Sequence, residues 1–158
     1  MQVDQFSIFF IISLLAALLT LVLAVVTQRS NPPNDTLSFS WLMLLVAIWC
    51  GSVAIGMEAT SEQAAFYWII MRMIGVIFSP VAWVFMVLQY TGQDKLVRFR
   101  NVLLALVVPL VSLALFITND SHHLFFSQIE YLQAGLFLVD ETWTLGPYFF
   151  LHLLYSYG

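Results

Sequence analysis

Three ionisable side chains fall within or at the ends of long apolar stretches, where a charge is costly. Glu58 ends one stretch, and Arg72 and His152 each lie about two helical turns into a later one. Such residues either pair with one another or mark a site for a ligand, an ion or a proton. One interpretation is a structural Glu58–Arg72 ion pair, with His152 bonded to a neighbouring backbone group. The other is an outward-opening pocket for a small ligand, formed by these three residues with Tyr67 and Tyr155.

Two adjacent histidines, His122 and His123, follow another apolar stretch and lie close to Asp120 in the sequence. Such a group can bind a metal ion or change charge near neutral pH, but its spacing matches no defined metal motif and also fits a solvated loop. Cys50, the single cysteine, lies in an apolar run and is interpreted as a packing residue. The sequence contains no nucleophile–base arrangement, phosphate-binding glycine loop or zinc motif. We therefore predict no catalytic residues, no cofactor and no enzymatic activity for this region.

The composition places these residues in a membrane. Of 158 residues, 61% are hydrophobic and 9% are charged, whereas about 25% of the residues of a soluble domain are charged. No basic run that could hold nucleic acid is present. The first apolar stretch, residues 5–28, is longer than the apolar core of a signal peptide and lacks its basic start. The sequence therefore predicts an integral membrane protein that retains its first helix and has the lipid bilayer as a partner.

The apolar stretches have the length of membrane spans. A helix needs about 20 apolar residues to cross the hydrocarbon core, and charged or turn-forming residues divide the chain into four such stretches and a shorter fifth. We therefore predict an all-α transmembrane bundle in a single domain covering residues 1–158. Its four complete helices and the start of a fifth lie at about residues 6–27, 37–57, 64–90, 101–117 and 147–158.

Proline and glycine mark special positions in these helices. Pro80, in the middle of the third predicted helix, removes one backbone hydrogen bond and frees the carbonyl of Val76, which predicts a kink. Such a kink serves either helix packing or a signalling hinge. Gly92 suits the C-terminus of the third helix, and Pro147 suits the first turn of the fifth.

The segment from residue 118 to residue 146 differs from the rest of the chain. It combines acidic residues and two histidines with many aromatic and β-branched residues. This composition favours a folded loop over a linker. Apolar runs on both sides of Ala134 and Gly135 favour a short β-hairpin.

Basic residues indicate the orientation, because lysine and arginine accumulate on the cytoplasmic side of membrane proteins. Arg29 lies in loop 28–36, and Lys95, Arg98 and Arg100 lie in loop 91–100, whereas the N-terminus and loop 118–146 contain no basic residue. We therefore predict a multi-pass protein of the plasma membrane. Its N-terminus and loop 118–146 are extracytoplasmic, and its loops 28–36 and 91–100 are cytoplasmic.

Several segments resemble the N-terminal seven-transmembrane sensor region of histidine kinases, which also occurs on some diguanylate cyclases. The third helix combines Pro80 with the ending Gln89, Tyr90, Thr91 and Gly92. The other matching positions end the second helix, follow the fourth and open the fifth: Glu58; Thr118, Asn119, His122, His123, Leu124 and Phe125; Gly146, Pro147, Phe149, His152, Tyr155, Ser156 and Tyr157. The resemblance covers essentially the whole chain and implies seven helices, with this chain ending in the fifth.

This resemblance implies a membrane-embedded sensory input domain. It would relay an extracytoplasmic or membrane stimulus, such as an unknown small ligand, to a cytoplasmic kinase or cyclase domain, and a full-length kinase is expected to be a homodimer. A transporter or channel fragment is the alternative, but it would need broken helices in repeated positions or a line of polar residues through the bundle. A light-sensing pigment would need a lysine for retinal, and the only lysine, Lys95, falls in a loop.

Overall fold

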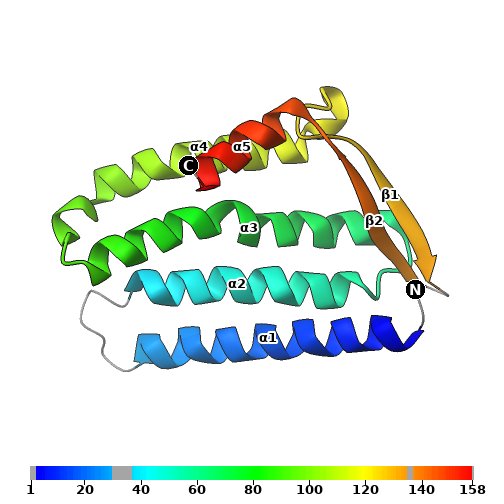
Figure 1. The fold of residues 1–158 in the computed structure, drawn as a ribbon, viewed down its shortest axis with the longest axis horizontal. Coiled ribbons are helices and arrows are strands. Elements are labelled where there is room, and N and C mark those ends of the chain that lie inside the picture. The colour runs from blue at the N-terminus through cyan, green and yellow to red at the C-terminus, as the bar shows by residue number, and fades with distance from the viewer. Residues whose placement is uncertain (1–2, 30–36, 135–136, 158) are drawn as a thin grey trace.

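The chain forms a bundle of helices with a β-hairpin at one end (Figure 1). The computed structural model describes residues 3–29, 37–134 and 137–157. The elements, in chain order, are α1 (Val3–Arg29), α2 (Leu37–Gly56), α3 (Glu62–Tyr90), the 3-10 helix η2 (Asp94–Leu96), α4 (Phe99–Ile117), the 3-10 helix η3 (Asn119–Ser121), β1 (Phe126–Ala134), β2 (Phe137–Leu145) and α5 (Pro147–Tyr157).

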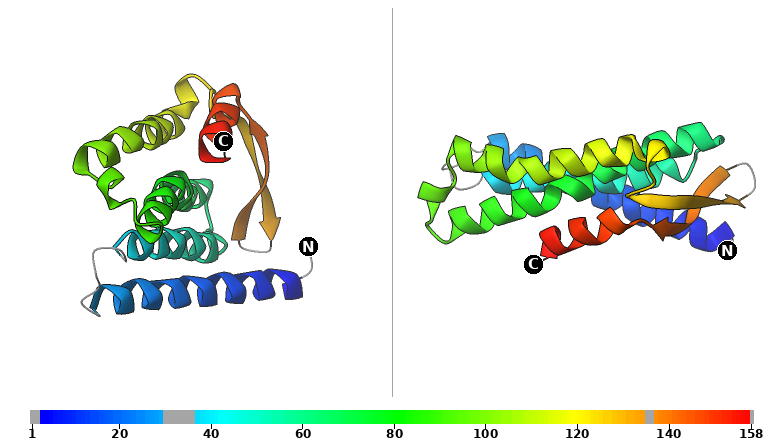
Figure 2. Two further views of the ribbon diagram at one scale, coloured as in Figure 1. Left: turned by 60° about the vertical axis from the view of Figure 1, so that its left-hand side comes forward. Right: turned by 90° about the horizontal axis from the view of Figure 1, so that it is seen from above.

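Helices α1 to α4 are long and apolar enough to cross a membrane, by length and composition. They lie side by side, and the shorter α5 turns back along α4 (Figures 1 and 2). The predicted all-α membrane bundle, with four long apolar helices and a shorter fifth, is therefore confirmed. Helices α1, α3 and α4 begin earlier than predicted, at Val3, Glu62 and Phe99.

Small residues allow the first three helices to pack closely. Between α1 and α2, the Ser40 Oγ donates to the carbonyl of Ala24 at 2.9 Å. Between α2 and α3, a Cβ added at Gly75 would lie 2.7 Å from the Leu45 carbonyl oxygen and 2.8 Å from the Trp49 Cβ. Only glycine fits this approach, as is common where membrane helices pack through van der Waals contact rather than through the hydrophobic effect.

The ends of the helices follow local sequence rules. The Ser61 side chain accepts a hydrogen bond from the Ala64 N–H and caps α3. Gly92 follows the end of α3 with a φ of 72°, in the left-handed region that glycine tolerates. Pro80 lies inside α3 and Pro109 inside α4, and each proline leaves the carbonyl four residues earlier without its helical donor.

The predicted hairpin is confirmed and is longer than expected. Strands β1 and β2 pair in antiparallel fashion from Phe126 opposite Leu145 to Ala134 opposite Phe137. They therefore occupy most of the segment that was predicted as a loop. The predicted turn at Ala134 and Gly135 lies partly outside the described residues, since residues 135–136 are not described.

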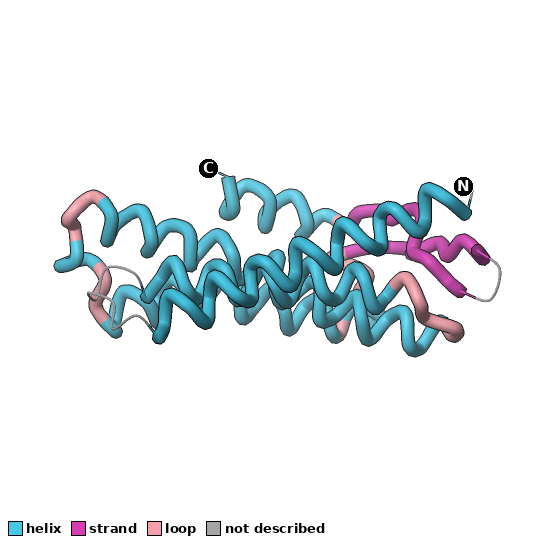
Figure 3. The backbone as a smooth tube through the Cα atoms, turned by 90° about the horizontal axis from the view of Figure 1, so that it is seen from below, coloured by secondary structure: helices cyan, strands magenta, loops and turns pink. Residues whose placement is uncertain are grey.

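The bundle has two ends of different character (Figure 3). We call one the hairpin end, because it carries β1, β2 and the N-terminal end of α1. We call the other the η2 end, because it carries η2, the C-terminal end of α1 and the first turn of α2. A buried apolar cluster lies toward the hairpin end and consists of Ile69, Met73, Ile77, Phe116, Phe125 and Phe126.

Candidate functional site at the hairpin end

The buried ring of Phe116 on α4 joins three parts of the structure at the hairpin end. Its side chain is fully buried. The ring centroid lies 6.3 Å from that of Phe66 on α3, 5.2 Å from Phe125, 5.3 Å from Phe126 and 6.1 Å from Trp143 on β2. Each favourable aromatic pair adds about 0.5–1.5 kcal/mol beyond the burial of area. The hairpin is therefore packed onto α3 and α4 rather than free in solvent.

Asn119 fixes the start of the hairpin to the end of α4. Its buried side-chain Nδ2 donates to the carbonyl of Phe126 at 2.7 Å. Its Oδ1 accepts from the backbone N–H groups of Phe125 at 2.9 Å and Phe126 at 3.1 Å. One amide thus satisfies three buried backbone groups, which would otherwise be costly to bury.

His122 braces the same turn. Its Nε2 lies 3.1 Å from the Thr118 Oγ1, and its Nδ1 accepts from the Leu124 N–H at 3.1 Å. The neighbouring His123 has a φ of 52°. Among the residues that the structure describes, no group of three or more His, Cys, Asp and Glu side chains could hold a metal ion. Both ring nitrogens of His122 therefore form hydrogen bonds within this turn.

Gly146 sets the point at which α5 begins. Its N–H donates to the carbonyl of Phe125 at 2.9 Å, and the Tyr148 N–H donates to the carbonyl of Leu124 at 2.9 Å. An added Cβ at Gly146 would overlap the Leu124 carbonyl. Glycine is therefore required here for close approach of two backbones, and Pro147 follows as the first residue of α5.

Helix α5 is joined to α4 by a line of polar groups, which we call the polar seam: Ser112, Tyr148, His152, Tyr155 and the carbonyl of Ala105. The Ser112 Oγ lies 3.0 Å from the Tyr148 hydroxyl and 3.0 Å from the His152 Nδ1. Ser112 is fully buried and His152 is nearly so. The Ser112 hydroxyl also donates to the carbonyl of Val108 at 2.8 Å. With that proton used, Ser112 accepts from the Tyr148 O–H and from an N–H at the His152 Nδ1.

The far end of the polar seam is a backbone carbonyl that a proline in α4 leaves without its helical donor. Pro109 has no N–H, so the carbonyl of Ala105 lacks its helical donor. The Tyr155 hydroxyl donates to this carbonyl at 2.8 Å. Tyr148, His152 and Tyr155 are spaced four and three residues apart, which places all three on one face of α5. The seam therefore runs along both helices in antiparallel directions.

Arg72 connects α3 to the hairpin. Its guanidinium carbon lies 5.5 Å from the centroid of the Trp143 ring on β2. A cation over an aromatic face contributes about 0.5–2 kcal/mol, depending on how far it is removed from water. The charged Arg72 side chain therefore lies against Trp143, which belongs to the segment that was predicted as a loop.

The five predicted ligand-binding residues lie in four places. His152 and Tyr155 belong to the polar seam, with ring centroids 6.5 Å apart, and Arg72 lies against Trp143. Glu58 lies exposed in the turn after α2, and Tyr67 is 60% exposed on α3. The Glu58–Arg72 ion pair stays a prediction. A ligand pocket shared by all five residues stays a prediction.

The comparisons with known proteins identify the family. The model of the N-terminal 7TM region of histidine kinase matches residues 11–158. The chain belongs to this family. No curated protein and no solved structure matched it.

The residues that resemble this 7TM region have structural roles here. At the hairpin end, Asn119, His122 and Gly146 build the turn that orients the hairpin and α5. At the η2 end, the Gln89 Oε1 accepts from the Ser38 N–H at 3.3 Å, so a residue of α3 satisfies a free N–H in the first turn of α2. Each resembling segment therefore lies where two elements are joined.

Sequence reasoning missed Ser112 and Pro109 as members of the site. A serine in an apolar helix usually bonds its own backbone, so Ser112 was not distinguishable from Ser52 or Ser79. A usable signal was the pair Pro109 and Ser112, because Pro109 frees the carbonyl of Ala105, and Ala105 and Ser112 lie seven residues apart on one face of α4.

Proposed function

We propose that this chain is the sensory input domain of a histidine kinase. It relays an extracytoplasmic or membrane stimulus through its helices to a cytoplasmic kinase or cyclase domain of a longer, homodimeric protein. The family match supports the class of function. The observation that carries the mechanism is the polar seam, because it ties α5, the helix that leaves the hairpin, to α4 at Ser112.

The stimulus acts, in this proposal, on the hairpin end. Trp143 of β2 contacts both Arg72 and Phe116. A displacement of the hairpin therefore acts on α3 and α4 together. Tyr148 and His152 then pass the shift into α5. A small ligand held by Glu58, Arg72, His152, Tyr67 and Tyr155 is one form of stimulus, and a change in the surrounding lipid is another.

The free energy of the hydrogen bonds in the polar seam suits a switch between two helix packings. Hydrogen bonds between membrane helices contribute about 0.6 kcal/mol on average and up to about 1.7 kcal/mol. Three such bonds are worth about 2 kcal/mol, which changes the ratio of two helix packings by about thirtyfold. A stimulus with a comparable preference for one packing can therefore move the equilibrium.

The test is the kinase activity of the full-length protein in proteoliposomes. Ser112→Ala removes the centre of the polar seam and is expected to change the basal autophosphorylation rate about three- to tenfold. Ser52→Ala is the matched control, because Ser52 is also buried and bonds only the Ile48 carbonyl of its own helix at 2.6 Å. Equal rates for wild type and both variants, at equal expression, would reject the polar seam as the relay.

The orientation is a separate part of the proposal. Lys95, Arg98, Arg100 and Arg29 all lie at the η2 end, which supports a cytoplasmic η2 end and an extracytoplasmic hairpin end. In a Cys50→Ala background, a membrane-impermeant thiol reagent added to intact cells should label Asp4→Cys and not Lys95→Cys. Labelling of Lys95→Cys from outside would reverse the assignment.

A further inference from the structure

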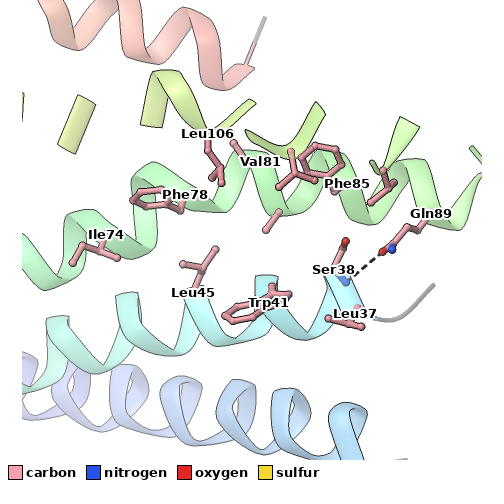
Figure 4. Close-up of a pocket in the computed structure, with 13 residues that line it drawn as sticks. Leu37, Ser38, Trp41, Leu45, Ile74, Phe78, Val81, Phe85, Gln89 and Leu106 are labelled. Carbon is pink, nitrogen blue, oxygen red and sulfur yellow. Dashed lines mark hydrogen bonds between the residues drawn. The ribbon is translucent and has the colours of Figure 1, made fainter. Parts of the chain in front are cut away.

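A cavity of about 620 Å³ lies between α2, α3 and α4 at the η2 end (Figure 4). It is separate from the polar seam, which lies between α4 and α5. Sites for small molecules usually have volumes of about 300–1,000 Å³, so this cavity is large enough to hold a flexible apolar chain.

The walls of the cavity are almost entirely apolar. Trp41 and Leu45 come from α2, Phe78 and Phe85 from α3, and Leu106 from α4. Two polar side chains, Ser38 and Gln89, line it at the first turn of α2, where the Gln89 Oε1 accepts from the Ser38 N–H. The cavity is therefore an apolar slot with one polar end (Figure 4).

In the segment 94–100 next to this polar end, basic residues outnumber the one acidic residue, Asp94. Val97 and Val102 line the cavity, and exposed Lys95, Arg98 and Arg100 lie in the same short segment of chain. We call these three residues the basic rim. Helices α2 and α4 both begin at this end with no acidic residue in their first turn, so their partial positive charges add to the rim.

We propose that the cavity binds an acyl chain of an anionic phospholipid, whose phosphate lies against the basic rim. The apolar walls fit the chain, and the rim complements the headgroup. Juxtamembrane basic residues bind anionic lipid surfaces by the same attraction. A further helix of the protein could fill an apolar space, but an apolar helix would leave the charge of the rim without a counterpart. This inference does not depend on the sensory role.

Lipid photocrosslinking of the full-length protein tests the proposal. The protein is placed in nanodiscs that contain phosphatidylglycerol with a photoreactive group on its acyl chain, and the labelled residues are mapped by mass spectrometry. We expect labels on the cavity walls, for example on Leu45 and Phe78. Ala82→Trp fills the cavity and should reduce these labels about tenfold, a loss of ~1.4 kcal/mol in binding.

Val84→Trp is the matched control for the cavity, since Val84 is on the same helix and is 46% exposed. Val102→Phe is a milder cavity-filling variant for use if Ala82→Trp does not fold. Both cavity variants should lose the wall labels, and the control should keep them. Equal labelling in Ala82→Trp, Val102→Phe and Val84→Trp would overturn the proposal.

The basic rim is tested with the same reagent. Arg98→Gln and Arg100→Gln should each weaken the labelling of the cavity about fivefold, whereas Arg29→Gln, at the same end of the bundle, should not. Phosphatidylcholine carrying the same photoreactive group should label the walls weakly in every variant. Labels confined to the outer faces of α1 and α4, or crosslinks from the walls to another segment of the protein, would overturn the proposal.

Discussion

The hairpin end and the η2 end of the bundle are held together in different ways. At the hairpin end, Phe116 lies among aromatic rings from α3, β1 and β2, and Asn119 and Ser112 bond buried polar groups. At the η2 end, α2, α3 and α4 enclose a cavity of about 620 Å³ with largely apolar walls and the Gln89–Ser38 hydrogen bond at one end. The hairpin end is thus packed closely around Phe116, whereas the η2 end encloses a cavity.

Because the two ends are packed differently, we expect them to respond differently to the displacement of a residue. Filled interiors pack at the density of organic crystals, so a displacement at one residue is transmitted to its neighbours. A cavity absorbs displacement or accepts a ligand. We therefore expect changes at the hairpin end to disturb the whole bundle and comparable changes at the η2 end to be tolerated.

Removal of the Phe116 ring should give the largest effect. Phe116→Ala leaves a cavity among four aromatic neighbours and should lower the free energy of unfolding by about 3–5 kcal/mol. Phe99→Ala, at the η2 end of the same helix, is the control because Phe99 is 83% exposed. Unfolding in a titration with SDS measures both. A similar loss for the two variants would remove the distinction between the ends.

Removal of a single side-chain amide should give an intermediate effect. Asn119→Ala leaves the backbone groups of Phe125 and Phe126 without partners, at a cost of about 1–3 kcal/mol. Asn101→Ala loses only one hydrogen bond, from the exposed Asn101 Nδ2 to the Leu96 carbonyl at 2.9 Å, and should cost less than about 1 kcal/mol. Limited proteolysis of the hairpin should increase for Asn119→Ala alone, and a protected hairpin in that variant would contradict the assigned role.

The smallest effect is expected from one hydroxyl of the polar seam. Tyr155→Phe leaves the Ala105 carbonyl without a donor beside Pro109 and should cost about 0.5–1.5 kcal/mol. Tyr157→Phe is the control, since Tyr157 is 86% exposed. The amide exchange rate in the middle of α4 should rise in Tyr155→Phe and stay unchanged in Tyr157→Phe. Unchanged exchange in both variants would show that the bond does not hold α5 to α4.

The membrane bundle could be predicted from the sequence because apolar length and the placement of charges determine which segments span a bilayer. Gly92 and Pro147 were predicted at helix ends for the same local reasons that the structure shows. The hairpin was underestimated, because its register irregularities at Phe126/Gln128 and Glu130/Tyr131 break the regular alternation that identifies a strand.

The candidate site was only partly predictable. Depth in the membrane selected Arg72 and His152, but depth does not determine which face of a helix a residue occupies. The structure places Arg72 against Trp143, a neighbour that depth alone does not identify. Ser112 and His152 are 40 residues apart in the sequence. A pattern among neighbouring residues cannot predict such a contact.

The central claim is that the polar seam couples α5 to α4 and thereby controls the output of the kinase. A double-mutant cycle of Ser112→Ala and Tyr148→Phe in the full-length protein tests it most directly, with the autophosphorylation rate in proteoliposomes as the readout. If the seam acts as one unit, the double variant should change the rate little more than Ser112→Ala does alone, because that change already breaks the contact with Tyr148. Additive effects of the two changes, or no effect of either, would contradict the account.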